Sequence, residues 1–426
     1  MNELLHKTTC MELSDTLETL SKVLPGIYVR ILSRIDERQR QKCALVLLWA
    51  TLAVRPLTIH QLADVIALQT STVLNRKQTM LGQLVLYRSF IRVQDGEIGL
   101  IHQSVRDYLL RDHPDQNPIL DMFRIRPEEG HCKIVLSCLD FLERGDALYD
   151  TWSQKLQILD YAIHHWPHNA QHVGNNADII FDISRPIFQN DSEVVFNWFN
   201  HHVNPGFVLR EIREVSTLHI ASIYGLTPWI RKLLAQKKLK FNLHRYLNRK
   251  DSQGYTPLLR STAGGHEAAT QLLLENCADV NVQQMFGKGP QELAAPGGVL
   301  PVLRLLLQHG ANINALGSQA YTLLTEVCSL KDLEMAQWLI AHGAIVNPTS
   351  KRMEPPLKSA AYTGSDDIVE LLIKHGADVN VKNKRGISAL SASMANKSSG
   401  TAQILLSHSA DPNCIDKYGF TNFRGH

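Results

Sequence analysis

The chain has 426 residues, of which 44% are hydrophobic and 20% charged, and its formal net charge is +3. This length allows two or three domains, the composition is that of an ordinary soluble protein, and the small net charge favours no class of partner. The seven cysteines are scattered and never form a Cys-x-x-Cys pair, which argues against a zinc ribbon or a disulfide framework and favours a reducing compartment. The sequence has no signal-peptide pattern and no apolar run long enough to cross a bilayer, so we expect an intracellular protein, cytoplasmic or nuclear.

The chain begins with segments 1–22 and 23–112, which we interpret as a helical tail and a winged-helix domain. Apolar residues at helical spacing predict helices over about 24–35 and 43–54. An Arg-Pro dipeptide follows the second of these helices and ends it, because the residue before proline is pushed out of helical geometry. A further helix is expected over about 72–86.

Two further helices of this domain are predicted from capping patterns at their N-termini. Thr58 followed three residues later by Gln61 is a capping box that opens another helix. After the hairpin described next, Ser104 and Asp107 are expected to cap the following helix.

A β-hairpin is predicted around the Asp-Gly dipeptide at 95–96. Asp-Gly between alternating apolar residues is a strong signal for a two-residue hairpin turn. Such a turn pairs Val93 with Ile98 and Ile91 with Leu100, which gives the hairpin a consistently apolar face. Three of these helices followed by a hairpin have the order of a winged helix.

Winged helices often bind DNA, and that function is the first alternative. The candidate recognition helix offers Arg76 and Lys77, whereas the wing tip carries Asp95 and Glu97, whose carboxylates would repel phosphates. We therefore favour a structural or regulatory winged helix and expect direct binding of nucleic acid to be absent.

Residues 113–212 are predicted to form a helical connector. His164, His165 and His168 have a spacing that could place imidazoles on one helix face, as in a metal site. Pro167 interrupts that helix, however, and no nearby cysteine or carboxylate completes a tetrahedral set, so packing around Trp166 is the preferred interpretation. An apolar layer is expected to join the winged helix to the next domain, through Trp152, Phe181, Phe188, Phe196, Trp198 and Phe199.

Residues 213–426 contain asparagine at an exact 33-residue step. The positions are Asn248, Asn281, Asn314, Asn347, Asn380 and Asn413. A period this sharp predicts stacked helical repeats, and 33 residues is the ankyrin period. Such units bury their apolar faces only against one another, so stacking creates one long core and an extended binding surface. We predict six full repeats and the start of a seventh.

Each predicted repeat has a first helix, a second helix and a glycine stop. Thr256 and Pro257 open the clearest first helix, since threonine caps it and proline fits its first turn. Gly310, Gly343 and Gly376 follow second helices, and Cys277 and Ser409 occupy the same slot, where a left-handed backbone strains them. Seven extra residues of the first repeat are expected within 236–246.

Several segments together carry a family resemblance. They are Arg55-Pro56-Leu57-Thr58, Leu100-Ile101-His102-Gln103-Ser104, Tyr161-Ala162-Ile163-His164-His165-Trp166-Pro167-His168 and the repeats. From about residue 17 to the end, they resemble the region after the nucleotide-binding module in fungal NACHT–ankyrin proteins, which are NLR-like. The resemblance implies a mostly α fold, an ankyrin-repeat solenoid preceded by a winged-helix domain and a helical connector. No Gly-x-x-x-x-Gly-Lys-Ser/Thr run occurs, so the NTPase module and its ATP-driven switching are not carried over.

The loops after the asparagines are the candidate partner-binding fingertips. They are neutral in the early repeats and basic in the later ones, at Lys351, Arg352, Lys382, Lys384, Arg385 and Lys417. Ordinary solvated loop charge is the alternative, but these cations would also suit an acidic surface on a partner protein.

The expected function is that of a non-catalytic scaffold or regulatory adaptor. We find no catalytic constellation and expect no cofactor and no metal. By analogy with other ankyrin proteins, a role in fungal signalling or as a transcriptional co-regulator is the preferred version. The remaining alternative is an NLR-like remnant that acts in trans with an intact NACHT protein.

Overall fold

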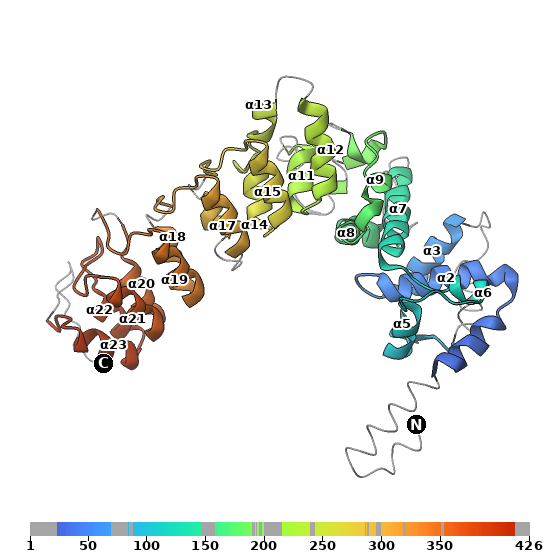
Figure 1. The fold of residues 1–426 in the computed structure, drawn as a ribbon, viewed down its shortest axis with the longest axis horizontal. Coiled ribbons are helices and arrows are strands. Elements are labelled where there is room, and N and C mark those ends of the chain that lie inside the picture. Colours follow the sequence, from blue (N-terminus) through green and yellow to red (C-terminus); the bar gives the residue numbers. More distant parts are fainter. Residues whose placement is uncertain are drawn as a thin grey trace, which may run out of the picture. The chain divides into compact units, whose positions relative to one another are not determined.

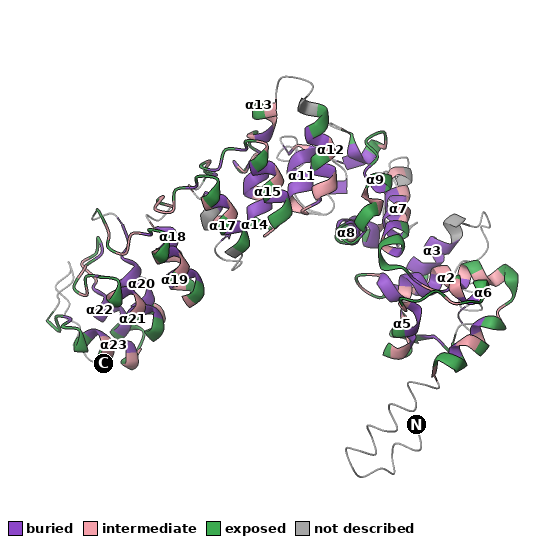
Figure 2. Cartoon of the chain, viewed as in Figure 1, coloured by how far each residue is buried: buried purple, intermediate pink, exposed green. Residues whose placement is uncertain are grey.

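The structure is a computed structural model. It describes residues 24–69, 84, 88–145, 158–189, 192, 194–195, 198–199, 215–238, 243–285, 287, 289–294, 300–317, 321–350 and 353–413. The chain divides into two compact units, residues 1–208 and residues 209–426 (Figure 1). Each unit has its own set of buried apolar side chains (Figure 2).

The first unit starts with the winged-helix elements. They are a helix over residues 24–33, α2 (Glu37–Leu52), β1 (Leu57–Thr58), α3 (Ile59–Gln69), β2 (Ile91–Gln94) and β3 (Glu97–Leu100). Helix α2 begins earlier than predicted, because the Asp36 side chain caps it by accepting from the Arg38 N–H at 2.9 Å. The capping box is confirmed, since Gln61 N–H donates to Thr58 Oγ1 at 3.2 Å and Thr58 N–H to Gln61 Oε1 at 3.0 Å. Apart from residue 84, the helix expected over 72–86 lies outside the described residues.

The hairpin has the predicted register. Val93 lies opposite Ile98, and the turn residues Asp95 and Gly96 have φ angles of 53° and 82°. Strand β1 pairs with β3 and adds a third strand, giving the order β1-β3-β2, which the sequence did not predict. The predicted apolar face is confirmed by the pairs Val93–Ile98 and Ile91–Leu100, and its burial is uneven, because Ile98 is buried whereas Val93 is 45% exposed.

The helix after the hairpin is α5 (Gln103–Leu109), and its predicted cap is wrong. His102 caps it, with Nδ1 accepting from the Ser104 N–H at 3.1 Å. Asp107 instead accepts from the Gln103 side chain at 3.0 Å. An imidazole nitrogen placed just before the helix fulfils the role that sequence patterns assign to serine or aspartate.

The rest of the first unit is helical. Its elements are α6 (Pro118–Asp121), α7 (Pro127–Gly145), α8 (Ile158–Ala170), η3 (Gly174–Asn176), α9 (Ala177–Ile180) and η4 (Pro186–Phe188). Helices α7 and α8 pack together, and α2 and α3 pack on them in turn. The winged-helix elements and these helices therefore share one core.

Helix α8 continues through Pro167, so the predicted interruption is wrong. Proline has no N–H to donate to the carbonyl four residues earlier, which is that of Ile163. The indole Nε1–H of Trp198 donates to that carbonyl instead, at 2.8 Å. The backbone group left unpaired by proline is thus satisfied from another segment of the chain.

The aromatic residues of the connector pack within the first unit. Trp166 lies 5.2 Å from Trp198 and 6.1 Å from Phe188, measured between ring centroids. Phe181 is 5.4 Å from Phe188, and all four side chains are buried. Three of the aromatics expected in the apolar layer therefore pack at α8 within the first unit, and the join to the next domain stays a prediction. Of the other aromatics expected in that layer, Phe199 is also buried, and Trp152 and Phe196 lie outside the described residues.

The second unit is a series of helix pairs. The first helices are α11 (Thr217–Ile223), α14 (Pro257–Ala263), α16 (Pro290–Ala294), α18 (Leu323–Leu330), α20 (Pro356–Thr363) and α22 (Ala389–Ala395). The second helices are α12 (Thr227–Lys238), α15 (Glu267–Glu275), α17 (Leu300–Gln308), α19 (Leu333–Ala341), α21 (Asp366–Lys374) and α23 (Ser399–Ser407). A short additional helix, α13 (Leu243–Leu247), follows α12 near the expected insertion. First helices pack on first helices of adjacent pairs, as stacked repeats require (Figure 1).

Candidate protein-binding surface

The recurring asparagines tie each repeat to the next. In Asn347, Nδ2–H donates to the Gly376 carbonyl at 2.7 Å and Oδ1 accepts from the Asp378 N–H at 2.8 Å. The same pair of contacts, 29 and 31 residues ahead, is made by Asn281, Asn314 and Asn380. The side chain satisfies backbone groups beyond the end of the next second helix, which fixes the base of the loop that follows.

The position just after each second helix, to which these asparagines donate, has a left-handed backbone. Gly310, Gly343 and Gly376 have φ angles of 87°, 90° and 83°, and the predicted strained occupants Cys277 and Ser409 have 66° and 65°. A side chain at such an angle brings Cβ close to the following carbonyl, whereas glycine has no such conflict.

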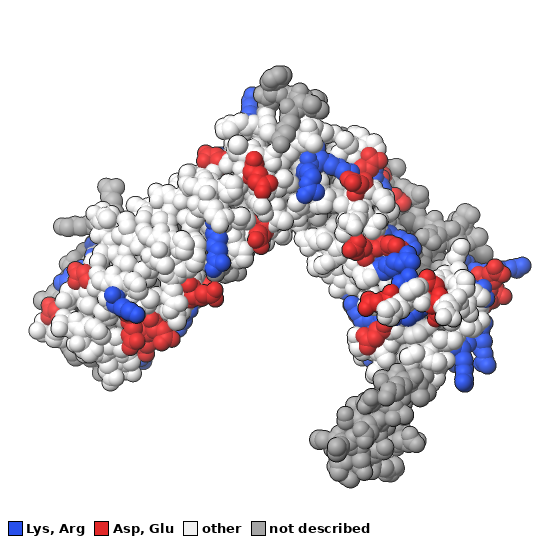
Figure 3. Space-filling model, viewed as in Figure 1, with Lys and Arg blue, Asp and Glu red and all other residues white. Residues whose placement is uncertain are grey.

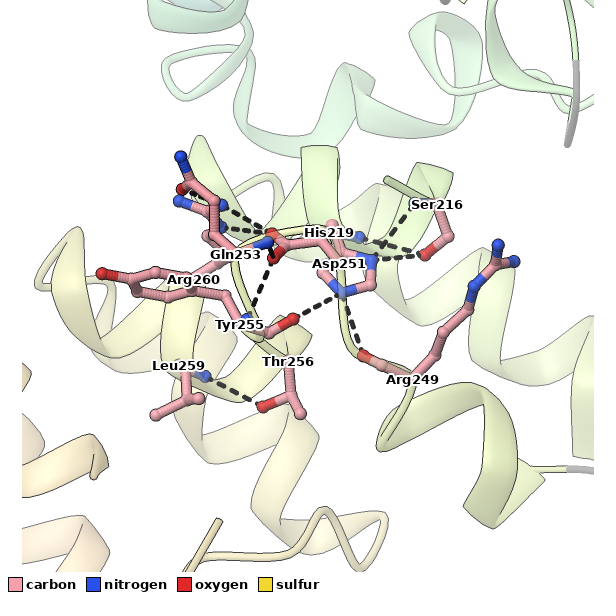
Figure 4. A network of polar contacts seen from close by, with 9 residues as sticks. All are labelled: Ser216, His219, Arg249, Asp251, Gln253, Tyr255, Thr256, Leu259 and Arg260. Carbon is pink, nitrogen blue, oxygen red and sulfur yellow. Dashed lines mark hydrogen bonds and ion pairs between the residues drawn. The ribbon is translucent and has the colours of Figure 1, made fainter. Parts of the chain in front are cut away.

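A polar network built on a buried histidine holds the first fingertip loop in place (Figure 4). His219 on α11 lies with Nε2 3.0 Å from the Arg249 carbonyl and 3.1 Å from the Tyr255 carbonyl. Its Nδ1 faces Ser216, which caps the same helix. Burial lowers the pKa of His219 to about 4, so the ring is neutral at physiological pH.

The turn within this loop is closed by Asp251. Its carboxylate accepts from the N–H groups of Gln253 and Tyr255 at 3.0 and 2.9 Å. The other oxygen pairs with the Arg260 guanidinium at 2.5 Å, and that guanidinium lies over the Tyr255 ring at 4.0 Å (Figure 4). A buried carboxylate with this many donors makes the turn rigid.

The fingertip over residues 380–388 repeats the same turn with asparagine in the place of Asp251. Asn383 Oδ1 accepts from the N–H groups of Arg385 and Ile387 at 2.9 and 3.0 Å. Asn383 Nδ2 donates to the buried Glu354 carboxylate of the preceding repeat at 3.2 Å, and Lys358 pairs with that carboxylate at 2.7 Å. Glu354 was not among the predicted site residues, although its i,i+4 spacing to Lys358 was a usable signal.

This rigid turn presents three of the six predicted partner-binding residues. Lys382, Lys384 and Arg385 are all exposed on one fingertip. We call these three residues the basic fingertip. The other three, Lys351, Arg352 and Lys417, lie outside the described residues.

Opposite charges are separated within the same repeat. Helix α21 carries exposed carboxylates at Asp366, Asp367 and Glu370, and acidic side chains gather over this helix in Figure 3. The basic fingertip follows that helix in the chain but belongs to the loop. An acidic partner would be attracted by the fingertip and repelled by α21, so the charges favour one docking orientation.

An exposed tyrosine lies on the first helix that precedes the basic fingertip. Tyr362 of α20 is 54% exposed, and the Lys358 ammonium lies 5.6 Å from its ring centroid. Leu330, near the corresponding position of α18, is 43% exposed. Aromatic side chains such as tyrosine are enriched among the anchor residues of protein interfaces, so Tyr362 is the candidate anchor.

The connector histidines contact other protein groups. His165 accepts from Arg55 Nε–H at 3.3 Å, and burial followed by the Arg55 charge lowers its pKa to about 4. His164 Nδ1 contacts the Asp160 carbonyl at 2.7 Å, and His168 packs on His172. Within the described ranges, no three or more His, Cys, Asp or Glu side chains are placed to hold a metal ion.

Two family models match the chain. Residues 292–383 and 357–423 match ankyrin repeats, and residues 32–120 match a winged-helix domain described as that of GPI inositol-deacylase. The fold is therefore mostly α, an ankyrin-repeat solenoid preceded by a winged-helix domain and a helical connector, as the sequence predicted. Ankyrin repeats are protein-interaction scaffolds and are typically non-catalytic.

Two curated relatives illustrate the similarity. The azaphilone pigments biosynthesis cluster protein L of Monascus ruber is 25% identical over 290 residues, which is 62% of this chain and 61% of that protein. A transient receptor potential cation channel subfamily A member 1 homolog of Caenorhabditis elegans is 33% identical over 102 residues, 24% of this chain and 8% of that protein. The chain thus spans less than two thirds of either relative.

Two ankyrin domains are among the solved structures that the chain matches. The human ASB11 ankyrin repeat domain covers 48% of this chain and 89% of its own, with 23% identity and a TM-score of 0.42. The ankyrin repeat domain of Bcl-3 covers 48% of this chain and 91% of its own, with 24% identity and a TM-score of 0.43. In the part of the chain that the structure describes, no helix combines the length and apolar character needed to span a bilayer.

Proposed function

We propose that this chain is a non-catalytic scaffold or regulatory adaptor whose repeats bind a partner protein through the basic fingertip. One observation carries the proposal: Lys382, Lys384 and Arg385 are exposed on a turn whose backbone is fixed by Asn383 and anchored to Glu354. Rigid presentation lowers the entropy lost on binding, so cations held in this way favour association more than the same charges on a loose loop.

The partner that fits this fingertip is a protein with an acidic surface. Carboxylates would pair with the fingertip cations, and an apolar group would contact the exposed Tyr362 on the neighbouring first helix. The acidic helix α21 would repel this acidic partner, so docking would be confined to the fingertip.

The cellular setting that we favour is a fungal one, in signalling or in transcriptional co-regulation, in the cytoplasm or the nucleus. The Monascus relative, named for a biosynthesis cluster, supports a fungal setting. The winged-helix match and the sequence resemblance together support an origin among NACHT–ankyrin proteins, with action in trans on an intact family member as the variant to test. Direct DNA binding is disfavoured, because the wing tip exposes Asp95 and Glu97.

The test is partner capture followed by association kinetics. Affinity purification with mass spectrometry of the full chain identifies the partner, and the triple variant K382Q/K384Q/R385Q is compared with R231Q/K374Q/K397Q. The control removes the same number of exposed positive charges elsewhere in the repeats. We expect the fingertip variant alone to slow association by about tenfold or more at low salt and to weaken its salt dependence. Equal kinetics for the two variants would refute the fingertip as the docking site.

A further inference from the structure

The second helices α17 and α19 leave a groove between them. Other neighbouring second helices, such as α15 with α17 and α19 with α21, are in closer contact. The groove has a volume of about 670 Å³ and is lined by Arg304, Leu307, Gln308, Ala311, Ile313, Trp338 and His342. This volume lies within the usual range of ligand-binding pockets.

One wall of the groove is aromatic and aliphatic. Trp338 occupies the position where the adjacent repeats have Leu305 and Leu371, one 33-residue step away in each direction. Its ring stacks on His342 with centroids 3.9 Å apart and an interplanar angle of 24°. Ile313 is partly buried against the repeat core and continues this apolar surface. An aromatic side chain therefore lines the groove at a position that is leucine in the adjacent repeats.

The polar lining of the groove combines the donors of Arg304 and Trp338 with Gln308 and His342, whose side chains can also accept. Arg304 is exposed, its guanidinium lies 5.7 Å from the Trp338 ring centroid, and no carboxylate among the described residues pairs with it. The indole N–H of Trp338 likewise has no acceptor within that part of the chain. His342 Nδ1 donates to the Trp338 carbonyl at 2.7 Å, which leaves Nε2 as the ring nitrogen open to a ligand.

We propose that this groove binds an acidic linear peptide segment of another protein. A carboxylate of the segment would pair with the Arg304 guanidinium, which suits carboxylates in a two-point geometry. A neighbouring apolar side chain of the segment would pack against Trp338 and Ile313. A single guanidinium is too few cations to bind a nucleic acid tightly, because such binding depends on contacts to several phosphates. The groove lies on second helices and does not depend on the basic fingertip.

The test uses a random peptide library displayed on phage and selected on the full chain. We expect the selected peptides to place Asp or Glu next to an aromatic or aliphatic residue. Fluorescence polarisation with labelled copies of these peptides should then show binding about tenfold weaker for R304Q and W338L, as expected when a charge-assisted hydrogen bond or its aromatic wall is lost. The matched controls K374Q and H375A alter the cation and the histidine of another second helix and should bind as wild type.

Three outcomes would overturn the proposal. They are selected peptides without acidic residues, binding that R304Q leaves unchanged, and a single-stranded oligonucleotide that displaces the peptides and itself requires Arg304. Because Arg304 is exposed, R304Q should fold normally, so it tests the proposal even if W338L unfolds. The basic-fingertip variant retains peptide binding if the two sites are separate, so a failure here is distinguishable from a failure of the proposed function.

Discussion

The Asn347 side chain donates to the carbonyl of Gly376, the residue whose left-handed backbone ends the next second helix. The same side chain accepts from the Asp378 N–H, so one carboxamide satisfies both ends of a short backbone segment in the following repeat. The 33-residue asparagine period therefore reflects a hydrogen-bond ladder between repeats, and each step of the ladder also positions a fingertip.

Replacing Asn347 by alanine should remove the side-chain hydrogen bonds that connect two adjacent repeats. The variant loses two hydrogen bonds to backbone groups, so we expect the repeats to lose about 1–2 kcal/mol of unfolding free energy. Urea unfolding followed by circular dichroism measures the change. Asn396→Ala is the control, since Asn396 is exposed and lies outside the ladder. Equal midpoints for the two variants would show that the ladder contributes nothing to stability.

Replacing Cys277 by glycine should stabilise the repeats, because its backbone has a left-handed conformation. Cys277 has φ of 66° in a slot where Gly310, Gly343 and Gly376 adopt similar angles. Cys277→Gly should raise the unfolding free energy by roughly 1 kcal/mol, because glycine relieves the contact between Cβ and the carbonyl oxygen. Cys277→Ala removes the thiol but keeps Cβ and serves as the control. A gain in the alanine variant equal to that in the glycine variant would locate the effect in the thiol and not in the backbone.

Local sequence patterns predicted the elements that depend on local chemistry. The turn at Asp95-Gly96 has the expected register, and the 33-residue period located the helix pairs and the strained Cys277 and Ser409. These features follow from backbone preferences of the residues themselves, so the sequence suffices. The third strand β1 was missed because two residues carry no periodic signal.

Features that depend on distant partners were not predictable. The helix continues through Pro167, and Trp198 from another segment supplies the donor that the Ile163 carbonyl would otherwise lack. The rigidity of the basic fingertip depends on Asn383 reaching Glu354, 29 residues earlier. The fingertip cations were predicted from charge alone. Trp338 was not predicted, although a tryptophan at a position of repeated leucine departs visibly from the pattern.

Replacing tyrosine by phenylalanine should have different effects on stability at two buried positions, Tyr161 and Tyr108. The Tyr161 hydroxyl accepts from the Val54 N–H at 3.0 Å and from Asn169 Nδ2–H at 3.3 Å, and so joins α8 to the end of α2. Tyr161→Phe leaves these donors unpaired and should destabilise the first unit by about 1–3 kcal/mol. The Tyr108 hydroxyl is buried without a hydrogen-bond partner among the described residues.

Tyr108→Phe is therefore the matched control for Tyr161→Phe. Removing an unpaired buried hydroxyl should leave stability unchanged or raise it slightly, since the unfolded state no longer gains its hydration. Thermal unfolding of both variants gives the comparison. A loss of stability in Tyr108→Phe as large as that in Tyr161→Phe would contradict the assignment of the Tyr161 hydroxyl as the link between the two helices.

Because His219 is buried, we expect the stability of the first fingertip loop to decrease at acidic pH. Its folded pKa of about 4 lies below the ordinary value of 6.5, because burial penalises the charged ring. The unfolded state therefore binds a proton that the folded state does not, between these two values. The stability that neutral His219 contributes is fully present above pH 6.5 and is lost as the pH falls toward 4, by up to about 1.4 kcal/mol per pH unit.

Hydrogen exchange of peptides from residues 215–263 tests this dependence locally, in wild type and in His219→Gln at matched pH. The glutamine variant loses the imidazole contacts to the Arg249 and Tyr255 carbonyls, so it should exchange faster at pH 7.5. Glutamine does not titrate, so the difference from wild type should shrink as the pH falls to 5. The exposed His375→Gln serves as the control and should follow wild type at every pH. A difference between wild type and His219→Gln that stays constant from pH 7.5 to pH 5 would mean that His219 is not the group whose protonation loosens the loop.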